Sequence, residues 1–186
     1  MNMSIKSRIK IILSALIITI GLDQYTKYLA TEHLMERLGG YSWFNGFFRL
    51  IYAENEGAFL SMGSESTGWL KYLGLYIFPV ILLLGLFWYL LKNQSLTKSQ
   101  ILALSLVLGG GISNIFDRLL YGKVVDFMIM GFEKLKTGVF NIADVAIMSG
   151  LFLLIFSRKP QEPAPEAEQS IEAKTETAGD LGKENS

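Results

Sequence analysis

Four long apolar segments dominate this sequence of 186 residues and restrict the folds that it can adopt. The twenty uncharged residues 72–91 suffice to cross the roughly 30 Å of hydrocarbon in a bilayer. Residues 99–116 give eighteen more, and residues 137–157 contain a single carboxylate before their end, at Asp144. We therefore predict a membrane protein of the all-α class, with four transmembrane helices at about 10–29, 70–91, 99–119 and 138–157.

The first apolar segment is the shortest, and its continuation places charges near the membrane. Residues 11–22 would cover only about 18 Å of helix at 1.5 Å per residue, so the helix must continue to about Leu29. Asp23 and Lys27 then lie at positions i and i+4, where they can pair on one face. A cleavable signal peptide would share the basic start, but no small-residue cleavage site follows it, and three further spans do.

Residues 31–69 form an outer segment between the first two spans. Its stretch GYSWFNGFFRLIY is dense in aromatic side chains, which are typical of the membrane–water interface. The segment could be an interfacial loop packed on the helices. It could also contain a short sheet, because FRLIYAENEGAF resembles two extended pieces around a turn. We expect a small extracytoplasmic, β-like cradle there.

Basic residues at the span ends predict the orientation. In a protein with four spans they fall on one side: Lys6, Arg8, Lys10, Lys92, Lys98, Arg158 and Lys159. That side should be cytoplasmic, with both termini inside and the acidic span ends gathered at the outer face. Residues 1–158 would form the membrane domain. Residues 159–186 carry seven acids and three lysines and have almost nothing to bury, which predicts a disordered acidic cytoplasmic tail without a catalytic role.

The chain contains no cysteine and one histidine, His33. This composition excludes disulfides, thiolate metal sites and a cysteine nucleophile, and it leaves at most one member of a histidine triad or zinc site. Residues 1–158 keep fourteen bases and ten acids, without the dense basic stripe of a nucleic-acid-binding protein. We therefore expect no metal, no cofactor and no nucleic acid. The chemistry should rest on carboxylates, hydroxyls or lysine.

The stretch 109–144 brings polar side chains close to hydrocarbon, where they are costly and by default mark a functional site. These residues are Asn114, Asp117, Arg118, Asp126, Asn141 and Asp144. Asp117 and Arg118 could instead mark the interfacial end of a helix, and the glycines 109–111 could serve only helix packing. Asn114 is harder to explain in this way, because its amide needs hydrogen-bond partners in lipid.

Asp126 and Asp144 lie on segments that should end at the same membrane depth, which suggests a pair. Either aspartate alone could be a capping or packing residue. Two close carboxylates cannot both ionise easily and therefore share a proton. One can take a proton from water while the other protonates a carbonyl oxygen, so the pair can hydrolyse a peptide without histidine, cysteine or metal.

Five motifs in register resemble the lipoprotein signal peptidase (signal peptidase II) family, over about residues 8–158. They are LDQYTK at 22–27, NEGAF at 55–59, GGISNIFDR at 110–118, VVDF at 124–127 and FNIAD at 140–144. The resemblance implies a four-span aspartic endopeptidase of the bacterial cytoplasmic (inner) membrane. Its substrates would be prolipoproteins, cut before a cysteine that carries diacylglycerol, and its other partners would be membrane lipids. We expect it to be a monomer.

The resemblance also implies residue roles. Asp126 and Asp144 match the catalytic dyad, and Asn114, Arg118 and Asn141 match residues that hold the dyad and the substrate backbone. Further matching positions are Asp23, Asn55 and Gly57 of the site and Asp117 of its structural network. Phe59 departs from the family, which often has a second small residue after NxGA, and this departure could alter the cradle.

Three other classes of function remain open from the residues alone. A small transporter or proton channel could use the Asp, Asn and Arg cluster as a relay, although the second span carries no such group. A serine protease could use Ser113, with His33 or a lysine as its base. A non-catalytic assembly protein would explain the spans but not the paired aspartates.

Overall fold

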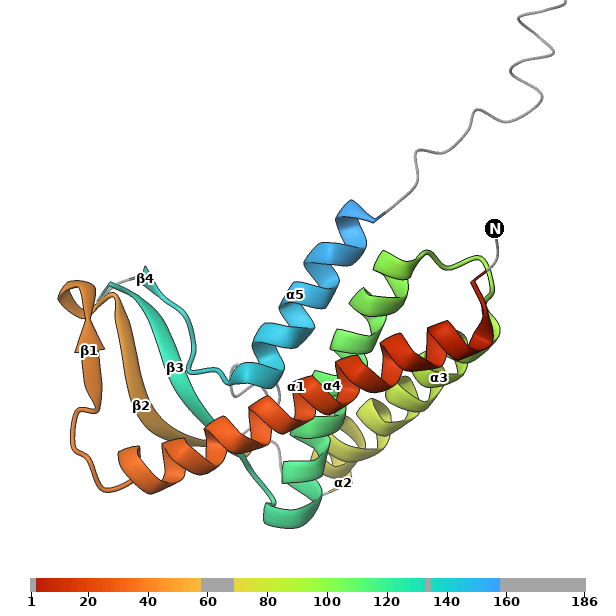
Figure 1. Cartoon of the computed structure of the whole chain (residues 1–186). Coiled ribbons are helices and arrows are strands. Elements are labelled where there is room, and N and C mark those ends of the chain that lie inside the picture. The colour runs from red at the N-terminus through yellow and green to blue at the C-terminus, as the bar shows by residue number, and fades with distance from the viewer. Residues whose placement is uncertain (1–2, 58–68, 133–134, 158–186) are drawn as a thin grey trace, which may run out of the picture.

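A computed structural model of the chain describes residues 3–57, 69–132 and 135–157. Its helices are α1 (Ile5–Leu34), α2 (Trp69–Tyr72), α3 (Phe78–Lys92), α4 (Lys98–Tyr121) and α5 (Ile142–Phe156). A π-helical stretch, Leu73–Ile77, joins α2 to α3, so that 69–92 is helical throughout. The strands are β1 (Tyr41–Trp43), β2 (Phe48–Asn55), β3 (Val124–Phe132) and β4 (Leu135–Lys136), with a 3-10 turn at Phe44–Gly46. The sheet projects from one end of the helical bundle, and α1 begins at the opposite end (Figure 1).

The predicted combination of a mainly helical protein with a small β-structured part is confirmed. Two helical segments of the described residues are long and apolar enough to cross a membrane, Leu73–Lys92 and Lys98–Tyr121. The apolar α5 is shorter, with 15 residues, whereas α1 has 30 and measures about 45 Å. Large apolar side chains such as Ile17, Leu84 and Phe156 point outward from the bundle, a surface that suits hydrocarbon better than water.

Helix α4 lies at the centre of the bundle, where glycines allow close approach to its neighbours. A Cβ atom at Gly110 would lie 2.4 Å from the backbone oxygen of Ala143 on α5, and one at Gly150 would lie 2.5 Å from the oxygen of Ala103 on α4. Because backbone atoms cannot easily move aside, larger residues at either position would separate the two helices. The glycines therefore set the distance between α4 and the start of α5.

The sheet is antiparallel, in the order β1-β2-β3-β4. Residues 48–55 form one continuous strand rather than the first part of the hairpin that the sequence suggested, because β2 pairs with β3, far along the chain. Residues 58–68, which include Phe59, lie outside the described residues, as does the predicted tail. A bulge between Leu50 and Ala53 shifts the register, so that Ala53 opposes Asp126 and Asn55 opposes Val124.

Helix α5 begins at Ile142, later than the predicted start of the fourth apolar segment at about 138. The preceding Phe140 forms a β-bridge with Met128 of β3, and Asn141 then caps the helix. The backbone amides of Phe127 and Met128 both donate to the oxygen of Phe140. This bridge fixes the first turn of α5 beside the middle of β3.

Candidate active site

Asp126 lies on β3, where its side chain is 2% exposed and faces the helices. On the paired β2, Asn55 is the diagonal neighbour of Asp126 on the same face of the sheet. Asn55 Nδ2 donates to Asp126 Oδ2 at 2.9 Å, and Asn141 Nδ2 donates to Asp126 Oδ1 at 2.7 Å. Each carboxylate oxygen of Asp126 therefore accepts an amide hydrogen bond.

Asp144 occupies the first turn of α5 as the partner of Asn141 in a capping box. Asn141 Oδ1 accepts a hydrogen bond from the Asp144 backbone amide at 3.0 Å, and Asp144 Oδ2 accepts one from the Asn141 backbone amide at 3.2 Å. The other oxygen, Oδ1, accepts from Asn114 Nδ2 at 3.0 Å. A carboxylate in this position is also stabilised by the positive end of the helix dipole.

Asn114 and Asn141 connect the two carboxylates. Asn141 Nδ2 donates to Asn114 Oδ1 at 3.1 Å, in addition to its bond with Asp126. The chain of contacts therefore runs from Asp126 through Asn141 and Asn114 to Asp144, across β3, α4 and α5. Four of the six residues that the sequence grouped by their cost in lipid are thus brought together.

Burial dominates the electrostatics of Asp126. Desolvation raises the pKa of this carboxyl group from 3.8 to about 6, and the nearby charge of Asp144 also raises it. The hydrogen bonds from Asn55 and Asn141 act in the opposite direction, because they stabilise the ionised form. Asp126 can therefore exchange a proton close to neutral pH, as acid–base catalysis requires.

A buried ionic network supports the pair from α1. Lys27 Nζ lies 2.6 Å from Asp23 Oδ2, as their spacing predicted, and 2.5 Å from Asp117 Oδ2. It also donates to Asn114 Oδ1 at 2.9 Å. Because Asn114 Oδ1 accepts from both Lys27 and Asn141, its Nδ2 must point toward Asp144. The network therefore fixes the orientation of the amide that contacts Asp144.

Asp23 ties the network to the start of α5. Its Oδ1 accepts a hydrogen bond from the Ala143 backbone amide at 2.7 Å, and its Oδ2 accepts one from Ser113 Oγ at 2.7 Å. Gln24 Nε2 donates to Ser113 Oγ and to Asp117 Oδ1. The sequence did not identify these roles of Gln24 and Ser113. The available signals were that Gln24 lies in the matched motif LDQYTK and Ser113 in the matched motif GGISNIFDR.

Arg118 extends from α4 to the end of β2. Its Nη2 donates to the Gly57 backbone oxygen at 2.8 Å, and its Nη1 donates to the backbone oxygen of Asn114 at 3.3 Å. Asn55 Oδ1 accepts from the Gly57 backbone amide at 3.0 Å. Gly57 is therefore held beside Asp126 from two sides. Within the described residues, the buried Arg118 Nε has no hydrogen-bond partner.

The other open classes of function find less support. Ser113 is 0% exposed and donates to a carboxylate, so its hydroxyl is not presented to a peptide. Within 73–116 there is no aspartate or glutamate that could extend a proton relay away from the sheet. The residues searched for metal sites, which are those that the structure describes, contain no group of three or more potential ligands among His, Cys, Asp and Glu.

Known proteins match this chain over most of its length. A family model described as Signal peptidase (SPase) II matches residues 15–158. The lipoprotein signal peptidase of Haemophilus ducreyi is 40% identical over 141 residues, which cover 75% of this chain and 84% of that protein. That of Buchnera aphidicola is 36% identical over 138 residues, covering 73% and 85%.

A solved structure described as a bacterial membrane enzyme superposes with a TM-score of 0.65 at 25% identity, covering 87% of this chain and 97% of that one. A second structure with the same description gives a TM-score of 0.64 at 26% identity. The sequence match, the membrane fold and the buried aspartates agree. The chain belongs to the signal peptidase II family, the aspartic lipoprotein signal peptidases.

Proposed function

We propose that Asp126 and Asp144 are the catalytic dyad of this lipoprotein signal peptidase. The substrate is a prolipoprotein, and the bond cleaved is the one before its diacylglyceryl-modified cysteine. The observation that carries the assignment is the bridge between two buried carboxylates through Asn141 and Asn114. The bridge holds both carboxylates ready to act on one peptide bond.

The dyad works with one proton between its two carboxyl groups. The ionised carboxylate takes a proton from water as the water oxygen attacks the scissile carbonyl carbon. The protonated carboxyl group gives its proton to the carbonyl oxygen, which produces a neutral tetrahedral diol. The carboxyl group that took the proton from water then gives it to the leaving nitrogen as the carbon–nitrogen bond breaks, and the other carboxylate takes back a proton from a hydroxyl group of the diol. The products are the signal peptide with a new carboxyl group and a lipoprotein with a free amino group on its cysteine.

The surrounding residues hold this arrangement. Asn55, Asn114 and Asn141 donate to the carboxylates and set their rotamers. Arg118 is suited to bind a backbone carbonyl of the substrate next to Gly57, because its guanidinium is half-buried and already contacts a backbone oxygen there. Asp23 and Asp117 act at a distance, through Lys27.

The protein would cross the membrane four times within a domain of residues 1–158, act as a monomer, and keep both termini in the bacterial cytoplasm. The dyad would then lie at the outer face. Two features support this orientation. The sheet and the start of α5 lie at the end of the bundle away from the N-terminus (Figure 1). The opposite end carries Lys6, Lys10, Lys92 and Lys98 without a carboxylate among the described residues nearby.

The test replaces each aspartate by asparagine, which preserves size. Asp126→Asn and Asp144→Asn should each insert stably into the membrane and accumulate uncut prolipoprotein, seen as a mobility shift on gels. Glu54→Gln is the matched control: Glu54 lies on β2, on the sheet that holds Asp126, but is exposed and pairs with Lys123. It should process normally. Normal processing by either aspartate variant would refute the assignment.

The substrate class has its own test with purified protein. A peptide with a diacylglyceryl cysteine should be cleaved before that residue, and the same peptide with an unmodified cysteine should be cleaved much more slowly. Equal rates for the two peptides would contradict the proposed specificity while leaving the dyad assignment intact.

A further inference from the structure

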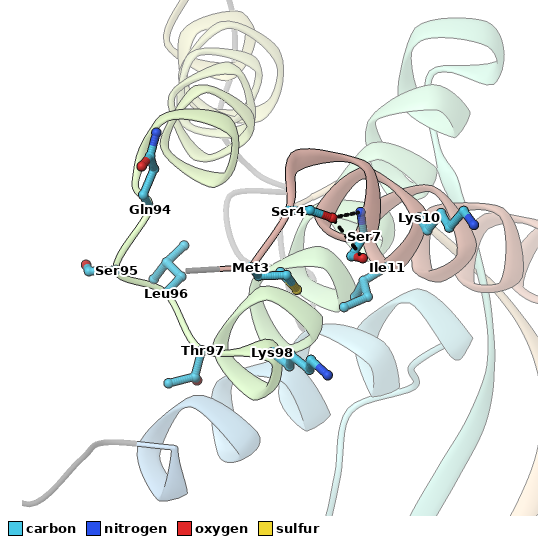
Figure 2. A pocket seen from close by; sticks show the side chains of 10 residues that line it. All are labelled: Met3, Ser4, Ser7, Lys10, Ile11, Gln94, Ser95, Leu96, Thr97 and Lys98. Atoms are coloured by element: carbon cyan, nitrogen blue, oxygen red, sulfur yellow. Dashed lines mark hydrogen bonds between the residues drawn. The ribbon is translucent and has the colours of Figure 1, made fainter. Parts of the chain in front are cut away.

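An open cavity of about 800 Å³ lies at the end of the bundle opposite the sheet. It is formed by the start of α1 and by the loop of residues 93–97 that connects α3 to α4 (Figure 2). None of the proposed site residues lines it. The peptidase mechanism therefore leaves this cavity unexplained.

The lining of the cavity is amphiphilic. Its polar part consists of hydroxyl, amino and amide groups, from Ser4, Ser7, Lys10, Gln94, Ser95, Thr97 and Lys98. Its apolar part comes from Met3, Ile11 and Leu96 (Figure 2). A ligand with a charged head and a hydrocarbon body would match both parts, whereas a small inorganic ion would use only the first.

The charge around the cavity is uniformly positive. Among the described residues, five bases lie at this end of the bundle, Lys6, Arg8, Lys10, Lys92 and Lys98. No aspartate or glutamate occurs in the described segments 3–22, 69–116 and 145–157, which form the helices around the cavity. The cations are therefore not neutralised by nearby carboxylates in this part of the described chain, and an anion would be attracted to them.

Hydrogen bonds hold the walls of the cavity in place. The buried Arg8 donates from Nη1 to the backbone oxygens of Leu90, at 3.0 Å, and Asn93, at 2.6 Å, and so connects α1 to the end of α3. Asn93 Oδ1 accepts from the Ser95 backbone amide, and Thr97 forms a capping box at the start of α4. Binding therefore need not order the loop, which lowers its entropic cost.

We propose that this cavity binds the head group of an anionic glycerophospholipid. The phosphodiester would contact Lys10, Lys98 and the hydroxyl groups of Ser7 and Thr97, while the glycerol and the first acyl carbons lie along Met3, Ile11 and Leu96. Basic pockets between membrane helices bind anionic head groups in this way. The site is independent of the dyad. In the proposed orientation of the protein, the lipid would belong to the cytoplasmic leaflet, and only this assignment rests on the proposed function.

The experiment compares two double variants of the full-length protein in neutral detergent. Lys10→Gln/Lys98→Gln removes the lysines that line the cavity. Lys6→Gln/Lys92→Gln removes the same charge from exposed lysines at the same end that do not line it. Phosphatidylglycerol, phosphatidylcholine and inorganic phosphate are added separately, and bound lipid is measured by native mass spectrometry together with the shift in unfolding temperature.

Phosphatidylglycerol should bind the unmodified protein and the Lys6/Lys92 variant with similar affinity, and the Lys10/Lys98 variant about tenfold or more weakly. Phosphatidylcholine should bind weakly to all three. Asp126→Asn should bind lipid normally, so a failed dyad assignment and a failed lipid site give different results. Equal losses in the two double variants would show general charge attraction and overturn the proposal, as would an equal effect of inorganic phosphate.

The competing occupant is the acidic segment 159–186 of this chain, which carries seven carboxylates. Carbodiimide crosslinking of the full-length protein distinguishes it from lipid. If Lys10 or Lys98 crosslinks efficiently to that segment and phosphatidylglycerol does not suppress the crosslink, the segment occupies the cavity and the lipid proposal is wrong. Suppression of any such crosslink by phosphatidylglycerol would support the lipid site.

Discussion

Asn141 Nδ2 lies 2.7 Å from Asp126 Oδ1, while Asn141 Oδ1 accepts the backbone amide of Asp144. One side chain thus caps α5 and contacts both aspartates. The two tasks depend on different atoms, the oxygen for the cap and the nitrogen for Asp126. Substitutions can therefore separate the stability of the helix from the chemistry of the dyad.

Asn141→Ser should keep the helix cap and lose the contact with Asp126, because serine caps helices well but is too short to reach the carboxylate. We expect a reduction in kcat of about tenfold or more, from the loss of a hydrogen bond to a charged group worth roughly 1.5–3 kcal/mol. Because this hydrogen bond lowers the pKa of Asp126, its loss raises that pKa further. The acid limb of the pH–rate profile should therefore shift to higher pH. Asn141→Ala should show both effects and lose about 1 kcal/mol of stability besides. An Asn141→Ser protein with unchanged kcat and pH profile would contradict this role.

The raised pKa of Asp126 predicts how stability changes with pH. A carboxyl group whose pKa is higher in the folded than in the unfolded protein stabilises the fold most at low pH. That contribution is lost as pH rises from about 4, the unfolded value, through about 6, the folded one. Unfolding temperatures between pH 4 and pH 7 should therefore fall more for the unmodified protein than for Asp126→Asn, which cannot ionise. The difference corresponds to on the order of 3 kcal/mol. Parallel curves for the two proteins would show that Asp126 titrates normally.

Local sequence patterns predicted the helices well, because an apolar run long enough to cross a bilayer can be seen in the sequence alone. The Asp23–Lys27 pair was also local, at i and i+4. The sequence did not predict the strand at 124–132, since VVDFMIM shows no alternation of apolar and polar residues. Its partner β2 lies about 70 residues earlier in the chain. For the same reason, the sequence could not show that Lys27 reaches Asp117 and Asn114, or that Ser113 bonds Asp23. The resemblance to known motifs supplied the grouping of Asn55 with Asp126 that local patterns lacked.

Lys27→Met should destabilise the protein strongly, because it leaves Asp23 and Asp117 buried without their cation. Breaking one partner of a buried ion pair costs about 3–5 kcal/mol. The triple variant Asp23→Asn/Lys27→Met/Asp117→Asn removes the stranded charges and should recover part of the lost unfolding temperature. Its activity should stay low, because Asn114 loses one of the two hydrogen bonds that fix its orientation. If Lys27→Met alone unfolds at the normal temperature, the cation is not needed for this network.

Gly110→Ala should impair both stability and activity, because the new methyl group would lie 2.4 Å from the backbone oxygen of Ala143. The start of α5 would have to move, and with it the cap residue Asn141 and the carboxylate of Asp144. Overpacking of this kind costs about 1–3 kcal/mol, and a displacement of the dyad lowers kcat further.

Two matched variants separate this effect from helix propensity. Gly111→Ala meets only the flexible end of the Leu83 side chain, and Gly85→Ala meets nothing within 4 Å. Measured by unfolding temperature and by cleavage rate, Gly85→Ala should be neutral or slightly stabilising and Gly111→Ala mildly affected. Equal behaviour of all three variants would mean that close contact between α4 and α5 does not set the geometry of the site.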